Sequence, residues 1–106
     1  MILVVDSGST KTDWIALNDK GEEIFSTQTL GLNPQMLSNE ILNERIKNNF
    51  DIYKNRKLVN KLFFYGAGCG VDSTQERILK VFKSIFINSE FDIKEDTYAA
   101  VYSAVD

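Results

Sequence analysis

The first third of the chain contains three short segments whose apolar positions predict β-strands. Residues 2–5 are all apolar and mostly β-branched, which is typical of a strand buried on both faces. Residues 13–17 predict a second strand, and the polar residues 18–21 predict a turn after it. Residues 23–29 alternate polar and apolar side chains and predict a third strand. Short connections of this kind predict that the three strands form an antiparallel meander.

The pattern then changes to a helical spacing. Apolar side chains recur at positions 37, 41, 42, 46, 50 and 53, which predicts an amphipathic helix of about four turns. Asn33 precedes Pro34, and this pair is typical of a helix N-cap followed by proline at the first helical position. The loop at residues 31–34 is therefore expected to lead directly into the helix.

The last part of the chain alternates between predicted strands and predicted helices. Residues 62–65 predict a fourth strand, which ends in the glycine-rich turn 66–70. Residues 73–76 match a capping box and predict the start of a second helix. Residues 91–93 predict a short fifth strand, and residues 96–105 predict a third helix.

The predicted order βββαβαβα defines an α/β fold. Right-handed crossovers would place the fourth strand beside the first and complete a mixed five-stranded sheet with flanking helices. This is a ribonuclease H-like arrangement. The 106 residues are 43% hydrophobic and 25% charged, which predicts a single globular domain over residues 1–106.

Charge and cysteine content exclude several classes of function. The net charge is −3 and the only basic cluster lies at residues 54–57, so no nucleic-acid partner is expected. One cysteine and no histidine allow neither an internal disulfide nor a zinc site, which favours a reducing, cytoplasmic location. No apolar run approaches the roughly 20 residues of a membrane helix, so no membrane partner is expected either.

A polar hairpin between the first two predicted strands has the composition of an anion site, with the sequence Asp6-Ser7-Gly8-Ser9-Thr10-Lys11-Thr12. Backbone N–H groups in a tight turn can bind an anion, and Gly8 lets a phosphate approach the backbone. A P-loop also ends in Lys-Thr, but it has a glycine before the lysine and opens a helix, whereas here a strand follows. The alternative is a polar β-turn with a solvated lysine, since Asp, Ser and Gly are common in turns.

Residues 4–14 closely resemble the first phosphate motif of the BadF/BadG/BcrA/BcrD-type ATPase family, part of the actin-like superfamily. That family includes N-acetylglucosamine kinases and ATP-dependent activators of 2-hydroxyacyl-CoA dehydratases. Residues 31–34 resemble its sugar-side loop, residues 64–69 its fourth strand and glycine turn, and residues 95–100 the segment with the catalytic aspartate. The resemblance therefore extends over the whole chain.

The resemblance implies a role for each residue that matches a motif. Asp96 would be the general base toward a sugar hydroxyl, with Glu95 as its nearest competitor, although Asp96 also occupies an ordinary N-cap position. Asp6 would orient Mg²⁺ through water. The remaining implied contacts are to the phosphates of ATP, from Gly8, Ser9, Thr10, Lys11 and Thr12, and to the sugar, from Asn33, Gly66 and Gly68.

The function that the resemblance implies is transfer of the γ-phosphoryl group of ATP to an amino sugar, with N-acetylglucosamine favoured. Family members are about twice as long, so the chain is expected to be an N-terminal domain that is inactive alone, and a homodimeric parent is compatible with the resemblance. The alternatives are an ATPase activator of a redox partner, which the single Cys69 weakens, and a non-catalytic nucleotide-binding module. A ribonuclease H-type nuclease would need several carboxylates around two metal ions, and the acidic, patch-free composition argues against it.

Overall fold

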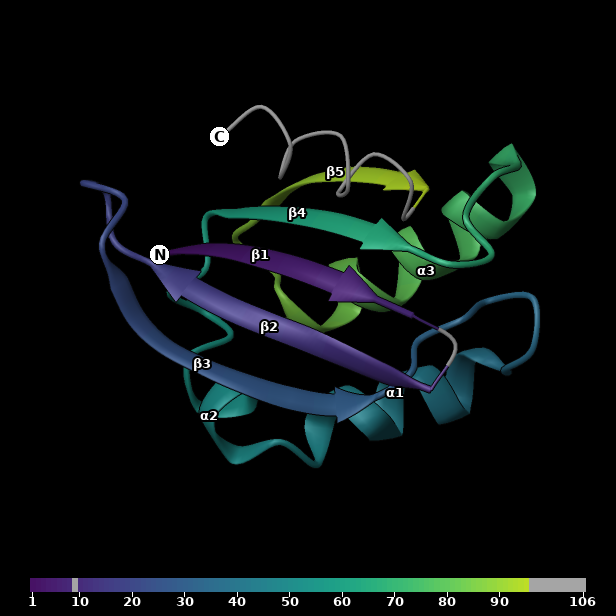
Figure 1. Cartoon of the computed structure of the whole chain (residues 1–106), viewed down its shortest axis with the longest axis horizontal. Coiled ribbons are helices and arrows are strands. Elements are labelled where there is room, and N and C mark those ends of the chain that lie inside the picture. Colours follow the sequence, from purple (N-terminus) through teal and green to yellow (C-terminus); the bar gives the residue numbers. More distant parts are fainter. Residues whose placement is uncertain (9, 96–106) are drawn as a thin grey trace.

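The computed structural model describes residues 1–8 and 10–95, which form one mixed five-stranded sheet with helices (Figure 1). The strand order is β3-β2-β1-β4-β5. β1, β2 and β3 form the predicted antiparallel meander, while β4 and β5 run parallel to β1. The prediction that the fourth strand lies beside the first is confirmed. The strands are β1 (Ile2–Ser7), β2 (Lys11–Leu17), β3 (Glu23–Leu30), β4 (Lys61–Gly66) and β5 (Glu90–Glu95).

The hydrophobic core lies between the sheet and the helices α1 (Asn39–Lys47), α2 (Phe50–Lys54) and α3 (Asp72–Ile85). Alternate strand residues point into this core because successive side chains of a strand face opposite sides of the sheet. The core includes Phe64 of β4 and Phe82 of α3, whose ring centroids are 5.0 Å apart. The fully buried strand residues on this face include Leu3, Val5, Trp14, Ala16, Leu62 and Phe64.

The opposite face of the sheet differs from the prediction for the first strand. Ile2 and Val4 are only half-buried, whereas Leu3 and Val5 of the same strand are fully buried. The prediction that residues 2–5 are buried on both faces was therefore wrong for the described part of the chain. In that part, none of the helices combines the length and the apolar composition needed to cross a bilayer.

The helix expected after Pro34 is two shorter helices, and it begins later than predicted. Residues 34–37 form a turn in which the carbonyl of Asn33 accepts hydrogen bonds from two N–H groups. The N-cap of α1 is Ser38, whose hydroxyl accepts from the Ile41 N–H at 3.3 Å. The helical pattern is interrupted at Asn49, which caps α2 by accepting from the Ile52 N–H at 3.1 Å. The capping role predicted for Asn33 was therefore wrong.

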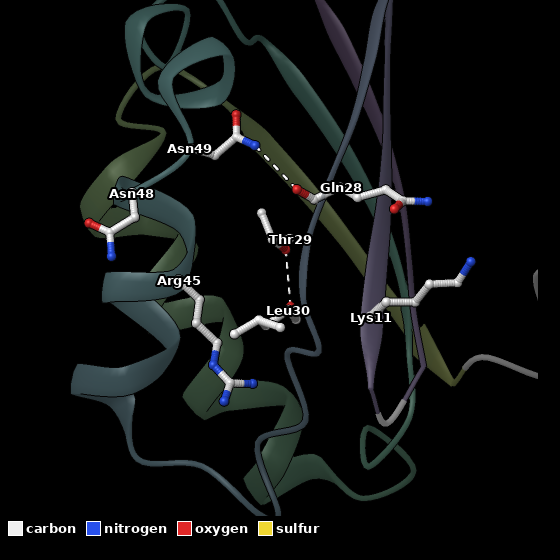
Figure 2. Close-up of a pocket in the computed structure, with 7 residues that line it drawn as sticks. All are labelled: Lys11, Gln28, Thr29, Leu30, Arg45, Asn48 and Asn49. Atoms are coloured by element: carbon white, nitrogen blue, oxygen red, sulfur yellow. Dashed lines mark hydrogen bonds between the residues drawn. The ribbon is translucent and has the colours of Figure 1, made fainter.

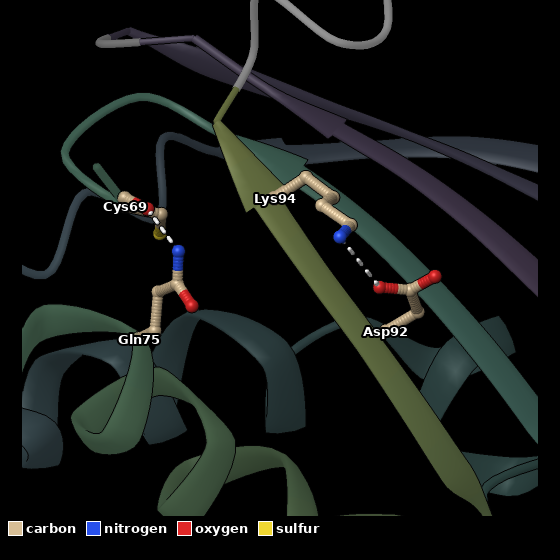
Figure 3. A network of polar contacts seen from close by, with 4 residues as sticks. All are labelled: Cys69, Gln75, Asp92 and Lys94. Atoms are coloured by element: carbon tan, nitrogen blue, oxygen red, sulfur yellow. Dashed lines mark hydrogen bonds and ion pairs between the residues drawn. The ribbon is translucent and has the colours of Figure 1, made fainter. Parts of the chain in front are cut away.

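The helix α3 also begins differently from its predicted capping box. Its N-cap is Val71, which makes no side-chain capping bond, and the Thr74 hydroxyl donates to the Val71 carbonyl at 2.9 Å. Gln75 reaches back to the glycine turn, where its side-chain amide donates to the Cys69 carbonyl at 2.6 Å (Figure 3). Nearby on β5, Lys94 and Asp92 form an ion pair at 4.0 Å. The third helix predicted for residues 96–105 lies outside the described residues.

Candidate functional site

Three parallel strands end side by side at one edge of the sheet. β1 ends at Ser7, β4 at Gly66 and β5 at Glu95, and these three residues are register partners. The β1–β2 hairpin, the glycine turn 66–70 and the loop after β3 all leave the sheet at this edge, on the right of Figure 1. Ligands of open α/β sheets bind outside the carboxyl ends of parallel strands. This edge is therefore the candidate site.

The β1–β2 hairpin has a shorter tip than the sequence predicted. β1 continues through Ser7 and β2 begins at Lys11, so only residues 8–10 connect the strands. The Gly8 N–H donates to the Lys11 carbonyl at 2.9 Å, and it is therefore engaged within the hairpin rather than available to an anion. A Cβ on Gly8 would meet only that carbonyl, at 3.7 Å, so the position is open to a ligand. The Thr10 and Lys11 side chains are exposed at the tip, while Ser9 lies outside the described residues.

Two buried hydroxyl groups connect the hairpin to the loop after β3. Ser7 Oγ and Thr12 Oγ1 are 2.8 Å apart, and both residues are completely buried. Thr12 Oγ1 can also donate to the Leu30 carbonyl at 3.1 Å, and Ser7 Oγ can donate to the Gly8 carbonyl at 3.4 Å, so either hydroxyl can be the donor in the bond between them. Ser7 Oγ in turn accepts from the Leu32 N–H at 2.9 Å. This hydroxyl chain gives Thr12 a structural role, and the phosphate contact expected of its side chain stays a prediction.

Asp6 lies on the sheet face opposite the helices, where its side chain is exposed. Its register partners are Asp13 on β2 and Tyr65 on β4. Directly opposed residues of antiparallel strands have Cα atoms about 4.5–5.5 Å apart, so Asp6 and Asp13 lie side by side on this face. The Asp13 carboxylate accepts a hydrogen bond from the Gln28 side-chain amide at 2.7 Å. Like charges in such positions repel each other, and a cation between them would relieve the repulsion.

A cation at this position would need ligands other than protein side chains. The described residues contain no cluster of three or more Asp, Glu, Cys or His side chains that could hold a metal ion. Mg²⁺ tolerates this because it usually keeps several waters and binds one or two carboxylates together with substrate phosphates. The Mg²⁺ ion that the sequence predicts at Asp6 therefore stays a prediction.

The loop after β3 is fixed by two arginines from the helices. Arg45 of α1 donates to the Gly31 carbonyl at 2.6 Å. Arg77 of α3 donates to the carbonyls of Pro34 and Leu37, the latter at 2.7 Å, and to the Asn39 side chain at 3.2 Å. The segment that carries Asn33 is thus held from both sides, although it is not helical.

Asn33 is brought into contact with the glycine turn. Gly68 has a φ of +79°, and a Cβ at this position would collide with the Asn33 side-chain amide. Asn33 Oδ1 accepts from the Gln35 N–H at 2.9 Å, which leaves its Nδ2 group as a hydrogen-bond donor. Two residues expected to contact the sugar, Asn33 and Gly68, therefore lie together. The third, Gly66, is buried beneath the Phe64 ring, so packing accounts for that glycine.

A surface hollow of about 500 Å³ lies beside the edge strand β3, lined by Lys11, Gln28, Thr29, Leu30, Arg45, Asn48 and Asn49 (Figure 2). The Lys11 side chain points away from the side of the hollow formed by the helix residues. Asn49 donates to the Thr27 hydroxyl at 3.0 Å, so it braces the helices against β3. The side chains of Lys11 and Arg45 therefore do not converge on one point of the hollow.

Sequence reasoning identified the segments of the site but missed the residues that hold them together. Arg77 lies 40 residues after Leu37, so no local pattern indicates its contact with the loop. Gln75 lies only six residues after Cys69, and sequence reasoning missed this contact as well. The pairing of Ser7 with Thr12 could have been found, because residues five apart across a short hairpin become cross-strand partners. The expected base Asp96 lies outside the described residues.

Comparison with solved structures shows that the chain has a kinase-like α/β fold. It superposes on a protein from Porphyromonas gingivalis, provisionally described as an N-acetylglucosamine kinase, with a TM-score of 0.80 and 27% sequence identity. The alignment covers 91% of this chain and 34% of that protein, so the chain spans about a third of its length. No family model matches the sequence, and no match is found among curated proteins.

Proposed function

We propose that the chain is the N-terminal part of an ATP- and Mg²⁺-dependent amino-sugar kinase of the ribonuclease H-like, actin-like ATPase class. One observation carries the proposal: the buried Ser7 hydroxyl binds the hairpin to the loop that contains Asn33. This contact lies where the parallel strands β1 and β4 end. The strand order and the likeness to a kinase-like structure support the same class. Resemblance of the hairpin to the BadF/BadG-type phosphate motif supports ATP as the phosphoryl donor.

The phosphate side of this site would consist of the exposed hairpin tip and the face that carries Asp6. The Lys11 ammonium and the Thr10 hydroxyl are exposed and available to the β- and γ-phosphates. Asp6 and Asp13 would hold the hydrated Mg²⁺ that neutralises those phosphates. Phosphoryl transfer depends mainly on such positioning and charge stabilisation, because little covalent chemistry falls to the protein.

The sugar side would lie between the Asn33 loop and the glycine turn. The Nδ2 group of Asn33, whose side chain lies against Gly68, would donate to a sugar oxygen. Asp96, directly after β5, would accept the proton of the attacking hydroxyl as a general base. The new bond joins that oxygen to the γ-phosphorus, the bond from the γ-phosphorus to the β,γ-bridging oxygen breaks, and ADP leaves.

The test is ATP consumption by the intact parent protein, supplied with Mg²⁺ and a panel of N-acetylated hexosamines. We expect ADP release that depends on N-acetylglucosamine and falls by at least 100-fold in Asp96→Asn and Asp6→Asn, as expected when a general acid–base or electrostatic group is removed. Asp19→Asn, in the turn between β2 and β3, is the matched control and should keep full activity. ADP release that no hexosamine stimulates would refute the kinase.

The same assay separates the alternatives. A redox-partner activator would hydrolyse ATP without a sugar and would need exposed cysteine ligands, whereas Cys69 is completely buried in the core. A regulatory module would bind ATP and release no ADP.

A further inference from the structure

The glycine turn between β4 and α3 supports two polar side chains that come from other parts of the chain. The Asn33 amide lies against Gly68, and the Glu95 carboxylate lies against Gly70. In each case a Cβ on the glycine would collide with the side-chain oxygen. The turn therefore places an amide and a carboxylate over two backbone positions that can be no more than about 7 Å apart.

The backbone at Gly70 does not itself require glycine. Positive φ angles among the described glycines occur only at Gly21 and Gly68, so Gly70 has a conformation that other residues adopt. All three nearest contacts of a Cβ at this position are atoms of the Glu95 side chain. The missing side chain at Gly70 therefore makes room for the Glu95 carboxylate.

Glu95 has no evident structural role to explain this arrangement. It is exposed at the end of β5, and its carboxylate has no hydrogen bond or ion pair with any residue of the described part of the chain. Glu90, at the other end of the same strand, is also exposed but lies away from the site edge. An exposed carboxylate that has no hydrogen-bond partner among residues 1–8 and 10–95 is suited to accept hydrogen bonds from a ligand.

We propose that Glu95 is a specificity-determining residue that accepts hydrogen bonds from hydroxyl groups of the bound sugar. Asn33 offers a donor and Glu95 offers acceptors, so together they match hydroxyl groups on different parts of one hexose ring. This inference rests on the proposed kinase function and assigns to Glu95 a positioning role rather than that of the base. A site built to bind a hydroxyl discriminates strongly against analogues that lack it, because its own polar group is then left unpaired.

The test is calorimetric titration of the intact parent protein with N-acetylglucosamine and its 3-, 4- and 6-deoxy analogues, without ATP. Glu95→Gln should weaken binding of N-acetylglucosamine by about 10-fold or more, as expected when a hydrogen bond to a charged acceptor is lost. For one deoxy analogue the wild type and Glu95→Gln should bind equally, because the hydroxyl that Glu95 contacts is already missing. Glu90→Gln is the matched control and should bind as the wild type does.

A second variant, Gly70→Ala, tests the same contact by adding a Cβ where the Glu95 carboxylate lies. Gly70→Ala should displace the carboxylate and weaken sugar binding in the same direction, while circular dichroism and the melting temperature stay close to those of the wild type. In turnover assays both variants should raise KM for the sugar and leave KM for ATP and the pH profile of kcat unchanged.

The outcomes separate this inference from the function on which it rests. Wild-type protein that neither binds nor phosphorylates any hexosamine would refute the kinase itself. A wild type that binds the sugar, with Glu95→Gln binding equally well, would overturn the role of Glu95 alone. Loss of kcat at an unchanged KM in Glu95→Gln would also overturn it, because Glu95 would then act as the base.

Discussion

Replacement of Ser7 by alanine tests whether the buried hydroxyl chain holds the hairpin to the loop after β3. The substitution removes the acceptor of the Leu32 N–H, which lies 2.9 Å from Ser7 Oγ in the buried interior. A buried donor left without a partner costs about 1–3 kcal/mol. The same change removes the bond of 2.8 Å to Thr12, a neutral hydrogen bond with a net contribution of about 1 kcal/mol. The free energy of unfolding should therefore fall by about 2–4 kcal/mol.

Urea unfolding of the 106-residue chain can measure this loss through Trp14, its single tryptophan, which is completely buried. With an m-value of about 1–3 kcal/mol/M, the midpoint should fall by about 1 M or more. Thr12→Val should lower the free energy of unfolding by less than Ser7→Ala does, because the Leu32 N–H keeps Ser7 Oγ as its acceptor. Ser26→Ala, exposed on β3, is the matched control and should change stability by no more than about 0.5 kcal/mol. If Ser7→Ala behaves like the control, the hydroxyl chain does not hold the site together.

Three further substitutions test other contacts of the site. Gly68→Ala should lower the free energy of unfolding by more than Gly21→Ala in urea unfolding. Alanine at a φ of +79° or +80° costs about 1–2 kcal/mol at either position, but only Gly68 also has a side chain packed against it. Equal losses would contradict that packing. Arg77→Met removes two hydrogen bonds to the loop before α1 and one to Asn39 at the start of α1, and it should lower the free energy of unfolding by about 2–3 kcal/mol. Lys80→Met on the exposed side of α3 should be neutral, and equal stabilities of the two variants would refute the bracing role. Lys11→Ala should raise KM for ATP about 10-fold or more in the intact protein without changing the melting temperature, and an unchanged KM would remove Lys11 from the phosphate site.

Most of the sheet could be predicted from the sequence because its pattern is local and periodic. The alternation of residues 23–29 and the apolar run 62–65 indicate strands, and the handedness of crossovers then limits how they can be ordered. The helix boundaries were less predictable because several polar residues compete for each cap. Ser38 rather than Asn33 caps α1, and Asn49 interrupts the helical pattern because its side chain bonds to β3 as well as to α2.

The candidate site was predicted as segments but not as an assembly. The hairpin, Asn33 and the glycine turn were all identified from local motifs, and the structure brings Asn33 and Gly68 into contact. The contacts that complete the site join residues far apart in sequence, such as Arg77 with Leu37 and Glu95 with Gly70. Such contacts depend on the packing of whole elements, which no short sequence window contains.

The hydroxyl chain has a consequence for how the two halves of the site move relative to each other. The phosphate half of the proposed site begins at Gly8, directly after Ser7, and the sugar half begins at Asn33, directly after Leu32. The buried hydrogen bond of 2.9 Å between the Leu32 N–H and Ser7 Oγ therefore lies next to both halves. A shift of Ser7 relative to Leu32 would break this bond. Misplacement of reacting groups by about 1 Å can slow a reaction about 100-fold. Under the proposed function, the distance between phosphoryl donor and acceptor is set during folding, so their freedom to separate is lost once and not at every turnover.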